Sequence, residues 1–172
     1  SGCRMHPRQK TTKRCYRGTA HRKCHGKRKP YLIVGVLGGS LTYEGDYGSC
    51  ISDRDLILSD VEASHRDGVP DDYLEFLEQF GFGDLDSALY IEDGPVKYAA
   101  IAKCEVDAYR HLYVFAGSGS GVLYAFDAEN DWAIVEIDPE LDGATVLFED
   151  FSSFILSQLA AVKGYVDWRA AQ

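Results

Sequence analysis

The sequence lacks long apolar stretches, and no run approaches the ~18 to 20 residues that a membrane-spanning helix needs. We therefore do not expect this chain to be an integral membrane protein. Residues 1–30 contain no Asp or Glu and no Val, Ile, Leu, Phe or Trp. A segment of that composition cannot bury enough apolar surface to offset its chain entropy, and we expect it to be disordered on its own. Residues 31–172 are long enough for one ordinary domain that needs no disulfide or metal.

Basic residues are scarce outside this lead segment (residues 1–30). The lead segment holds 11 of the 18 Lys and Arg, which leaves 7 of them against all 27 Asp and Glu in residues 31–172. The lead segment therefore carries a charge of +11 and the body (residues 31–172) a charge of −20. A body this acidic should repel nucleic acid and anionic lipid and attract basic partners. Solubility alone is the alternative explanation of the acidic surface.

The chain has an odd number of cysteines. Three lie in the lead segment and two in the body: Cys3, Cys15, Cys24, Cys50 and Cys104. A secreted domain would normally pair its cysteines, so an odd count without an export signal predicts a reducing compartment, the cytoplasm. The basic stretch before residues 31–37 imitates an export signal, but the apolar run is short and interrupted by Gly, and no small-residue cleavage site follows. We interpret residues 31–37 as a short strand.

Three helices are expected in the body. Residues 52–68 form the first, with Ser52 as its N-cap. Residues 70–81 form the second, because Pro suits the first turn, apolar residues recur at three- and four-residue spacing, and Gly suits the end. The last helix begins near residues 149–150, and Gly164 ends or bends it.

Between the second and the last helix, the apolar period changes to two. This pattern predicts five short strands in an antiparallel meander: residues 88–91, 96–102, 111–116, 122–127 and 132–137. The Gly-Ser-Gly-Ser-Gly stretch at residues 117–121 is predicted to be a turn with positive φ rather than a phosphate loop, because a strand follows it instead of a helix. The order of elements predicts an α+β fold, an antiparallel β-sheet meander with helices packed on one side.

Recognisable catalytic motifs are missing. The body contains two histidines, His65 and His111, and neither lies near a Ser or Cys in a nucleophile motif. Acidic pairs are too numerous to indicate catalysis, so we expect no enzyme and no cofactor. The lead segment contains six residues of zinc-ligand type: Cys3, His6, Cys15, His21, Cys24 and His25. Their spacing is irregular, and no apolar residue could pack beneath a metal. A zinc site is therefore the less favoured alternative to a polybasic arm.

Three stretches of the body resemble one known family in order and spacing. VPDDYLEFLEQFGFGDL resembles the Pro-x-x-Tyr-x-x-Phe-Leu signature of the SUKH superfamily, also called the Smi/Knr family. YVFAGSGSGVLYAFD resembles that family's strand pair around a glycine-containing turn, and FEDFSSFILSQL its closing helix. The resemblance covers residues 52–159 and implies a SUKH-like α+β fold without enzymatic activity. In bacteria, the family is similar to immunity proteins that neutralise polymorphic toxins, often nucleases.

The resemblance and the charge together give our functional hypothesis. We expect a bacterial, cytoplasmic immunity protein that binds a basic partner, a toxin nuclease domain, stoichiometrically. Its body is expected to bind no nucleic acid directly, and no membrane contact is expected. The alternative is a Smi/Knr-type regulatory hub without a toxin partner. Partner contacts are expected among acidic residues next to turns and motifs: Asp84, Asp86, Glu92, Asp93, Asp107, Asp127, Glu129 and Asp131. The tyrosines that alternate along the strands are expected to be core or cross-strand residues instead.

Overall fold

The structure, a computed structural model, describes residues 47–138, 140 and 143–172. The predictions for the lead segment, including the zinc alternative, and the strand expected at residues 31–37 lie outside the described residues.

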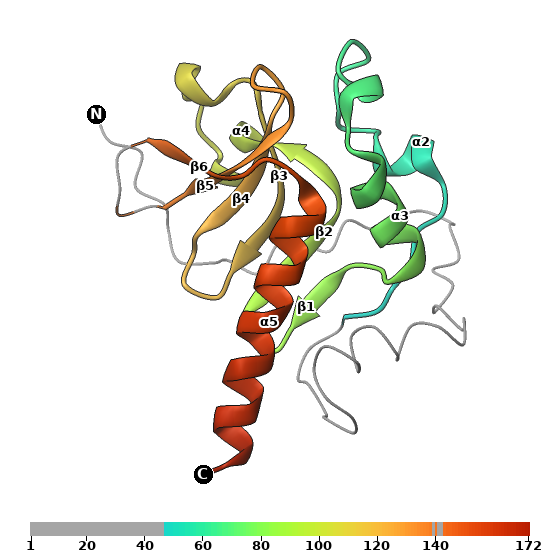
Figure 1. The fold of residues 1–172 in the computed structure, drawn as a ribbon. Coiled ribbons are helices and arrows are strands. Elements are labelled where there is room, and N and C mark those ends of the chain that lie inside the picture. Colours follow the sequence, from blue (N-terminus) through green and yellow to red (C-terminus); the bar gives the residue numbers. More distant parts are fainter. Residues whose placement is uncertain (1–46, 139, 141–142) are drawn as a thin grey trace.

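Six strands form one antiparallel sheet in the order of the sequence, β1 to β6 (Figure 1). Each strand pairs with the next, as in a meander. Their bounds are β1 Gly83–Leu85, β2 Leu89–Lys97, β3 Leu112–Ser118, β4 Leu123–Asp127, β5 Ala133–Ile137 and β6 Ala144–Phe148. The predicted α+β fold with an antiparallel meander is confirmed.

Three helices cover one face of this sheet. They are α2 (Arg54–Ile57), α3 (Asp71–Gln79) and α5 (Phe151–Ala170), and their apolar side chains share a core with inward residues of β2 to β5. A smaller apolar cluster on the other face includes side chains of the short α4 (Tyr98–Ala102) and of the segment after it. The strands alternate between the two clusters, since Tyr124 and Phe126 join the first and Leu123 and Ala125 the second.

Aromatic side chains dominate the main core. The ring of Tyr73, on α3, makes edge contacts with Phe115, Phe126 and Phe151 at centroid distances of 5.6, 5.2 and 5.2 Å. Phe115 and Phe126 stack across the β3–β4 pair at 4.1 Å. Tyr73 and Leu77 are completely buried, which confirms the predicted apolar stripe of the second helix.

The first helix is much shorter than expected. The prediction of a helix over residues 52–68 is wrong, because α2 ends at Ile57 and only a 3₁₀ turn, η1 (Arg66–Gly68), follows before α3. The N-cap is Asp53 rather than Ser52, because its carboxylate accepts the backbone N–H groups of Asp55 and Leu56. Tertiary packing explains the early end, since β2 approaches so closely that a Cβ on Gly94 would lie 2.2 Å from the carbonyl oxygen of Ile57.

The strand boundaries need corrections too. The predicted strands 88–91 and 96–102 are one strand, β2, with an irregular register between Ile91 and Val96, and residues 98–102 form α4. The alanine content of Tyr98–Ala102 favours that helix over the period-two pattern. Strands β1 and β6 were not predicted. Gly164 does not end the last helix, because α5 continues to Ala170.

Candidate interaction surfaces

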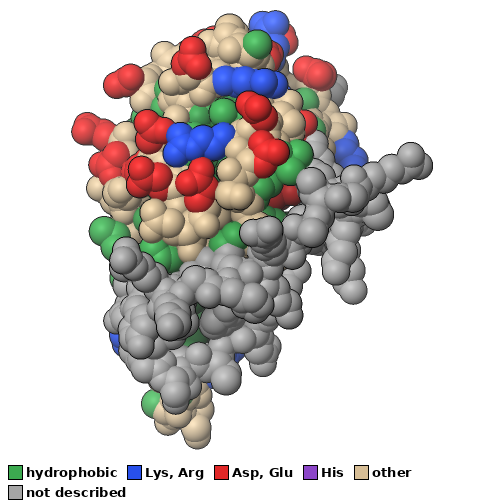
Figure 2. All heavy atoms as spheres, turned by 90° about the vertical axis from the view of Figure 1, so that its right-hand side faces the viewer, with side chains coloured by type: hydrophobic (Ala, Val, Ile, Leu, Met, Phe, Trp, Pro, Cys, Tyr) green, Lys and Arg blue, Asp and Glu red, His purple; other side chains and the backbone are tan. Residues whose placement is uncertain are grey.

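Carboxylates gather on α2 and α3. Residues 53–78 contain nine Asp and Glu but two Lys and Arg. Figure 2 looks at the side of the molecule where these two helices lie, and acidic side chains surround the few basic ones there. We call this the acidic face and define it by the carboxylates that α2, its cap and α3 supply: Asp53, Asp55, Asp71, Asp72, Glu75 and Glu78. The sequence hypothesis included none of them.

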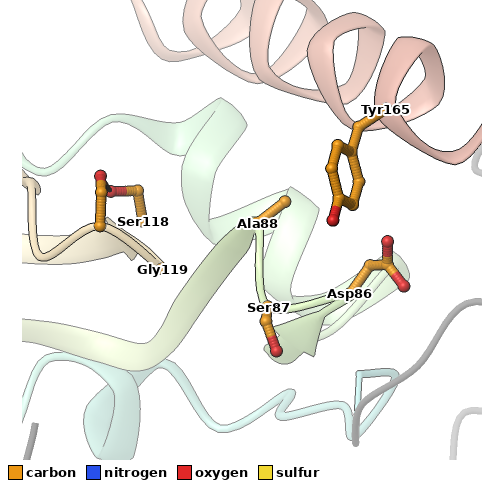
Figure 3. A pocket seen from close by; sticks show the side chains of 7 residues that line it. Asp86, Ser87, Ala88, Ser118, Gly119 and Tyr165 are labelled. Atoms are coloured by element: carbon orange, nitrogen blue, oxygen red, sulfur yellow. Dashed lines mark hydrogen bonds between the residues drawn. The ribbon is translucent and has the colours of Figure 1, made fainter. Parts of the chain in front are cut away.

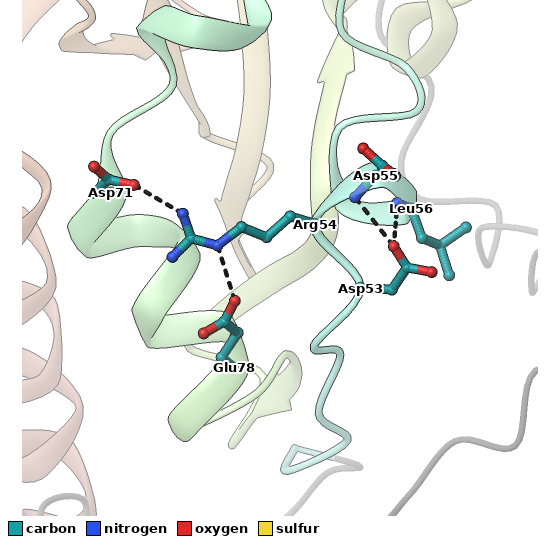
Figure 4. A network of polar contacts seen from close by, with 6 residues as sticks. All are labelled: Asp53, Arg54, Asp55, Leu56, Asp71 and Glu78. Atoms are coloured by element: carbon teal, nitrogen blue, oxygen red, sulfur yellow. Dashed lines mark hydrogen bonds and ion pairs between the residues drawn. The ribbon is translucent and has the colours of Figure 1, made fainter.

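One arginine joins the two helices of the acidic face. Arg54 donates from Nε to Glu78 Oε1 at 3.0 Å and from Nη1 to Asp71 Oδ1 at 2.9 Å (Figure 4). The hydrogen bond to Glu78, followed by the one to Asp71, raises the pKa of Arg54 further above its ordinary value. Both ion pairs of Arg54 lie at the surface, so they orient the two helices rather than contributing much to the free energy of unfolding.

The acidic face is also tied to α5. Asp72 Oδ2 accepts the backbone N–H of Ser152 at 3.0 Å and its hydroxyl at 2.7 Å. Asp55 and Glu75 are exposed, and no described residue forms an ion pair or hydrogen bond with either carboxylate. These two side chains are therefore available to a partner.

Of the eight predicted contact residues, four lie between β1 and the middle of β2. Asp84 accepts the backbone N–H of Ser87 at 2.8 Å, which supports the β1–β2 turn. The side chain of Asp86 is 0% exposed and pairs with Arg169 at 2.8 Å, so it offers no free carboxylate. Glu92 and Asp93 are half-buried on β2 and, after burial itself, contribute to raising the pKa of Tyr73.

The other four lie at the opposite end of the strands. Asp107 is almost fully exposed in the 3₁₀ turn η2 (Asp107–Tyr109). Asp127 accepts the backbone N–H of Glu129, and both carboxylates flank the ring of His111, at 3.5 Å from Nε2 and 3.8 Å from Nδ1. Asp131 lies in the β4–β5 turn with a positive φ of 50°. The eight residues thus do not form one surface.

The structure brings both histidines of the body to one groove. Its volume is about 790 Å³, and it lies where the α2–α3 connection, the segment from α4 to η2 and the β4–β5 turn meet. The lining mixes acidic, basic and aromatic side chains: Glu62, His65, Lys97, Tyr98, Ala99, Glu105, Val106, Asp107, Ala108, Tyr109, Arg110, His111 and Glu129. No local sequence signal predicts this convergence of three distant segments.

A small polar cluster at the groove joins His65 to β3. The hydroxyl oxygen of Tyr113 lies 2.8 Å from His65 Nδ1 and accepts from the backbone N–H of Glu62 at 3.4 Å. The Nζ of Lys97 lies over the Tyr113 ring, 4.6 Å from its centroid, and pairs with Glu62 at 3.0 Å. Burial opposes the charge of Lys97, but hydrogen bonds to Glu62 and Tyr113 raise the pKa of Lys97 above its usual value.

Two kinds of chemical group bear on catalysis and metal binding, a nucleophile beside a histidine and a cluster of metal ligands. The groove lining contains no Ser or Cys that could act as a nucleophile beside either histidine. No group of three or more His, Cys, Asp or Glu among the described residues could hold a metal ion. What the groove and the acidic face offer is polar and charged contact.

The two described cysteines differ from expectation. Cys50 and Cys104 are both disulfide-bonded. Disulfides are rare in reducing compartments, so these cysteines do not support the argument for a reducing environment that rested on their odd number.

Within the described residues, no helix is long and apolar enough to cross a bilayer.

Comparisons with known proteins add no relative. No protein-family model, curated protein or solved structure matches the chain. The resemblance to the SUKH superfamily therefore rests on the three sequence motifs alone.

Proposed function

We propose that the protein is a SUKH-type immunity protein that binds a basic toxin domain, a nuclease, and neutralises it stoichiometrically. The observation that carries this proposal is the uncompensated acidity of the body. The described residues contain 24 Asp and Glu against 7 Lys and Arg, a net charge of −17. Five of those seven cations already pair with carboxylates of the same chain: Arg54, Lys97, Arg110, Lys163 and Arg169.

The acidic face is the surface that we assign to the partner. A nuclease must present cations to hold phosphates, so a surface rich in carboxylates attracts it and competes with nucleic acid for the same cations. Arg54 links α2 to α3 and Asp72 links α3 to α5, and these contacts orient the elements that carry the carboxylates. The protein then needs neither catalysis nor a cofactor to block the toxin.

The test measures inhibition of the toxin encoded beside this gene as a function of salt. Tight inhibition with an association rate that falls as salt screens charges beyond a Debye length of ~8 Å supports the proposal. The double variant Asp55→Lys/Glu75→Lys should slow association, because both carboxylates are exposed and free of described partners. The matched control Glu140→Lys/Glu149→Lys reverses two exposed carboxylates elsewhere and should have a smaller effect. Tight binding without inhibition would favour the regulatory hub instead.

The proposal places the protein in the cytoplasm, where the nucleic acid that a nuclease attacks is found. The disulfide bonds of Cys50 and Cys104 in the structure argue against this placement, so the redox state of the two cysteines in cells tests it. Rapid alkylation of intact cells should find both as thiols in the cytoplasmic fraction. Recovery of the protein as a disulfide-bonded species outside the cytoplasm would overturn the placement.

A further inference from the structure

The C-terminal half of α5 carries large aromatic side chains that the fold does not use. Phe154, Leu159 and Val162 bury the helix against the sheet, whereas Tyr165 and Trp168 are 48% and 60% exposed. Figure 1 shows this end of the helix extending past the sheet. Exposed Trp and Tyr in contact with each other are typical of protein-binding surfaces.

One of these two aromatic residues, Tyr165, already contacts a guanidinium group. The rings of Tyr165 and Trp168 stack at a centroid distance of 6.3 Å. The guanidinium of Arg169 lies 5.7 Å from the centroid of Tyr165 and donates to Asp86 Oδ1 at 2.8 Å. An aromatic face and a carboxylate therefore act together on an arginine within the chain, which is the geometry of guanidinium recognition. We call Tyr165, Trp168 and Arg169 the aromatic patch.

A small pocket opens beside the aromatic patch. It has a volume of about 310 Å³, and Figure 3 shows Tyr165 reaching from α5 towards Ala88 and Asp86 at its wall. The β3–β4 turn forms the other wall, and it fits closely because a Cβ on Gly119 would lie 2.1 Å from the carbonyl oxygen of Ser87. Gly119 thus allows the close approach at this wall of the pocket. Gly121, in the same turn, adopts the predicted positive φ, at 95°.

We propose that the aromatic patch and its pocket dock an arginine-rich segment of the basic partner. This inference rests on the proposed function, because it names a surface and a side-chain type for the same partner. The described body, at −17, repels acidic proteins and anionic lipid, so the complementary occupant of an exposed Trp–Tyr pair is cationic. Arginine is favoured over lysine because its planar guanidinium stacks on aromatic faces and is less strongly hydrated.

The experiment uses the full chain and two fluorescein-labelled peptides of equal length and charge, one arginine-rich and one lysine-rich, in fluorescence anisotropy titrations. The arginine peptide should bind the wild type more tightly. Trp168→Ala should weaken the arginine peptide about two- to fivefold, the size of an exposed cation–π contact, and leave the lysine peptide nearly unchanged. Leu156→Ala is the matched control, because Leu156 is 56% exposed on the same helix and lies outside the aromatic patch.

Other outcomes separate this inference from the proposed function. If the two peptides bind the wild type equally, and Trp168→Ala changes neither affinity, the inference about the aromatic patch is wrong. If Asp55→Lys/Glu75→Lys weakens both peptides in the same experiment, the acidic face remains the partner surface. Binding to zwitterionic phosphatidylcholine vesicles that is lost in Trp168→Ala would overturn the inference in favour of a membrane contact. An unchanged thermal transition in each variant confirms that the fold is intact.

Discussion

Tyr73→Phe should stabilise the protein, although Tyr73 lies at the centre of the core. Its ring is completely buried, and its hydroxyl oxygen has no hydrogen-bond partner among the described residues. A buried hydroxyl without a partner costs about 1–3 kcal/mol, whereas the phenylalanine ring keeps the contacts with Phe115, Phe126 and Phe151. For a domain of this size, that gain corresponds to a rise in melting temperature of about 2–12 °C.

Tyr113→Phe is the matched control with the opposite sign. Tyr113 is equally buried, but its hydroxyl lies 2.8 Å from His65 Nδ1 and accepts the backbone N–H of Glu62 at 3.4 Å. Removing the hydroxyl takes this partner from both groups and should lower the free energy of unfolding by about 0.5–3 kcal/mol. Calorimetry or urea unfolding of the two variants decides between the signs.

Alkaline pH gives a second measurement on the same residue. Burial, followed by the charges of Glu92 and Asp93, raises the pKa of Tyr73 well above its ordinary value of 10.0. Below pH 10.0, Tyr73 is protonated in both the folded and the unfolded chain. As the pH rises above 10.0, Tyr73 ionises in the unfolded chain but not in the folded chain, so the free energy of unfolding should fall. Tyr73→Phe removes the part of this loss that Tyr73 causes, whereas Tyr98 and Tyr124, whose pKa values are also raised by burial, keep theirs. If the variant is instead less stable than the wild type at neutral pH, the hydroxyl has a partner, such as a buried water, and the reasoning is refuted.

Three further predictions concern packing and charge. Leu77→Ala removes a fully buried side chain and should cost about 2–5 kcal/mol in urea unfolding, and a change of only about 0.5 kcal/mol would contradict its burial. Gly119→Ala should cost about 1–3 kcal/mol in the same assay, because its Cβ would collide with the backbone of Ser87, and a neutral result would mean that the turn moves freely. Lys97→Gln should raise the pKa of Glu62 towards its ordinary value of 4.5 in an NMR titration, because the hydrogen bond to Lys97 is the main cause of the lowered pKa, and an unchanged titration would exclude that contact.

Much of the fold follows from local sequence patterns. The second helix was predicted from apolar spacing, and the structure confirms it as α3. The spacing was sufficient because the apolar stripe of this helix is buried in the main core. The extent of the first helix could not be predicted, since the close approach of Gly94 to the carbonyl of Ile57 depends on long-range packing. Strand β6 was missed because its side chains are exposed on both faces apart from Phe148, so no period-two alternation marks it.

The candidate surfaces were harder to predict than the fold, and the reason lies in what carboxylates do at turns. Asp next to a turn is favoured there because its side chain accepts local backbone N–H groups, as Asp84 and Asp127 do. A rule that selects acidic residues beside turns therefore selects side chains that the fold already uses. Carboxylates on the solvent side of a helix, such as Glu75, have no such local donor, because helical N–H groups beyond the first turn bond to the helix itself. In a protein whose partner is attracted by charge, Asp55 and Glu75, the exposed helical carboxylates without described partners, are thus the ones whose reversal should slow association with the least cost to folding.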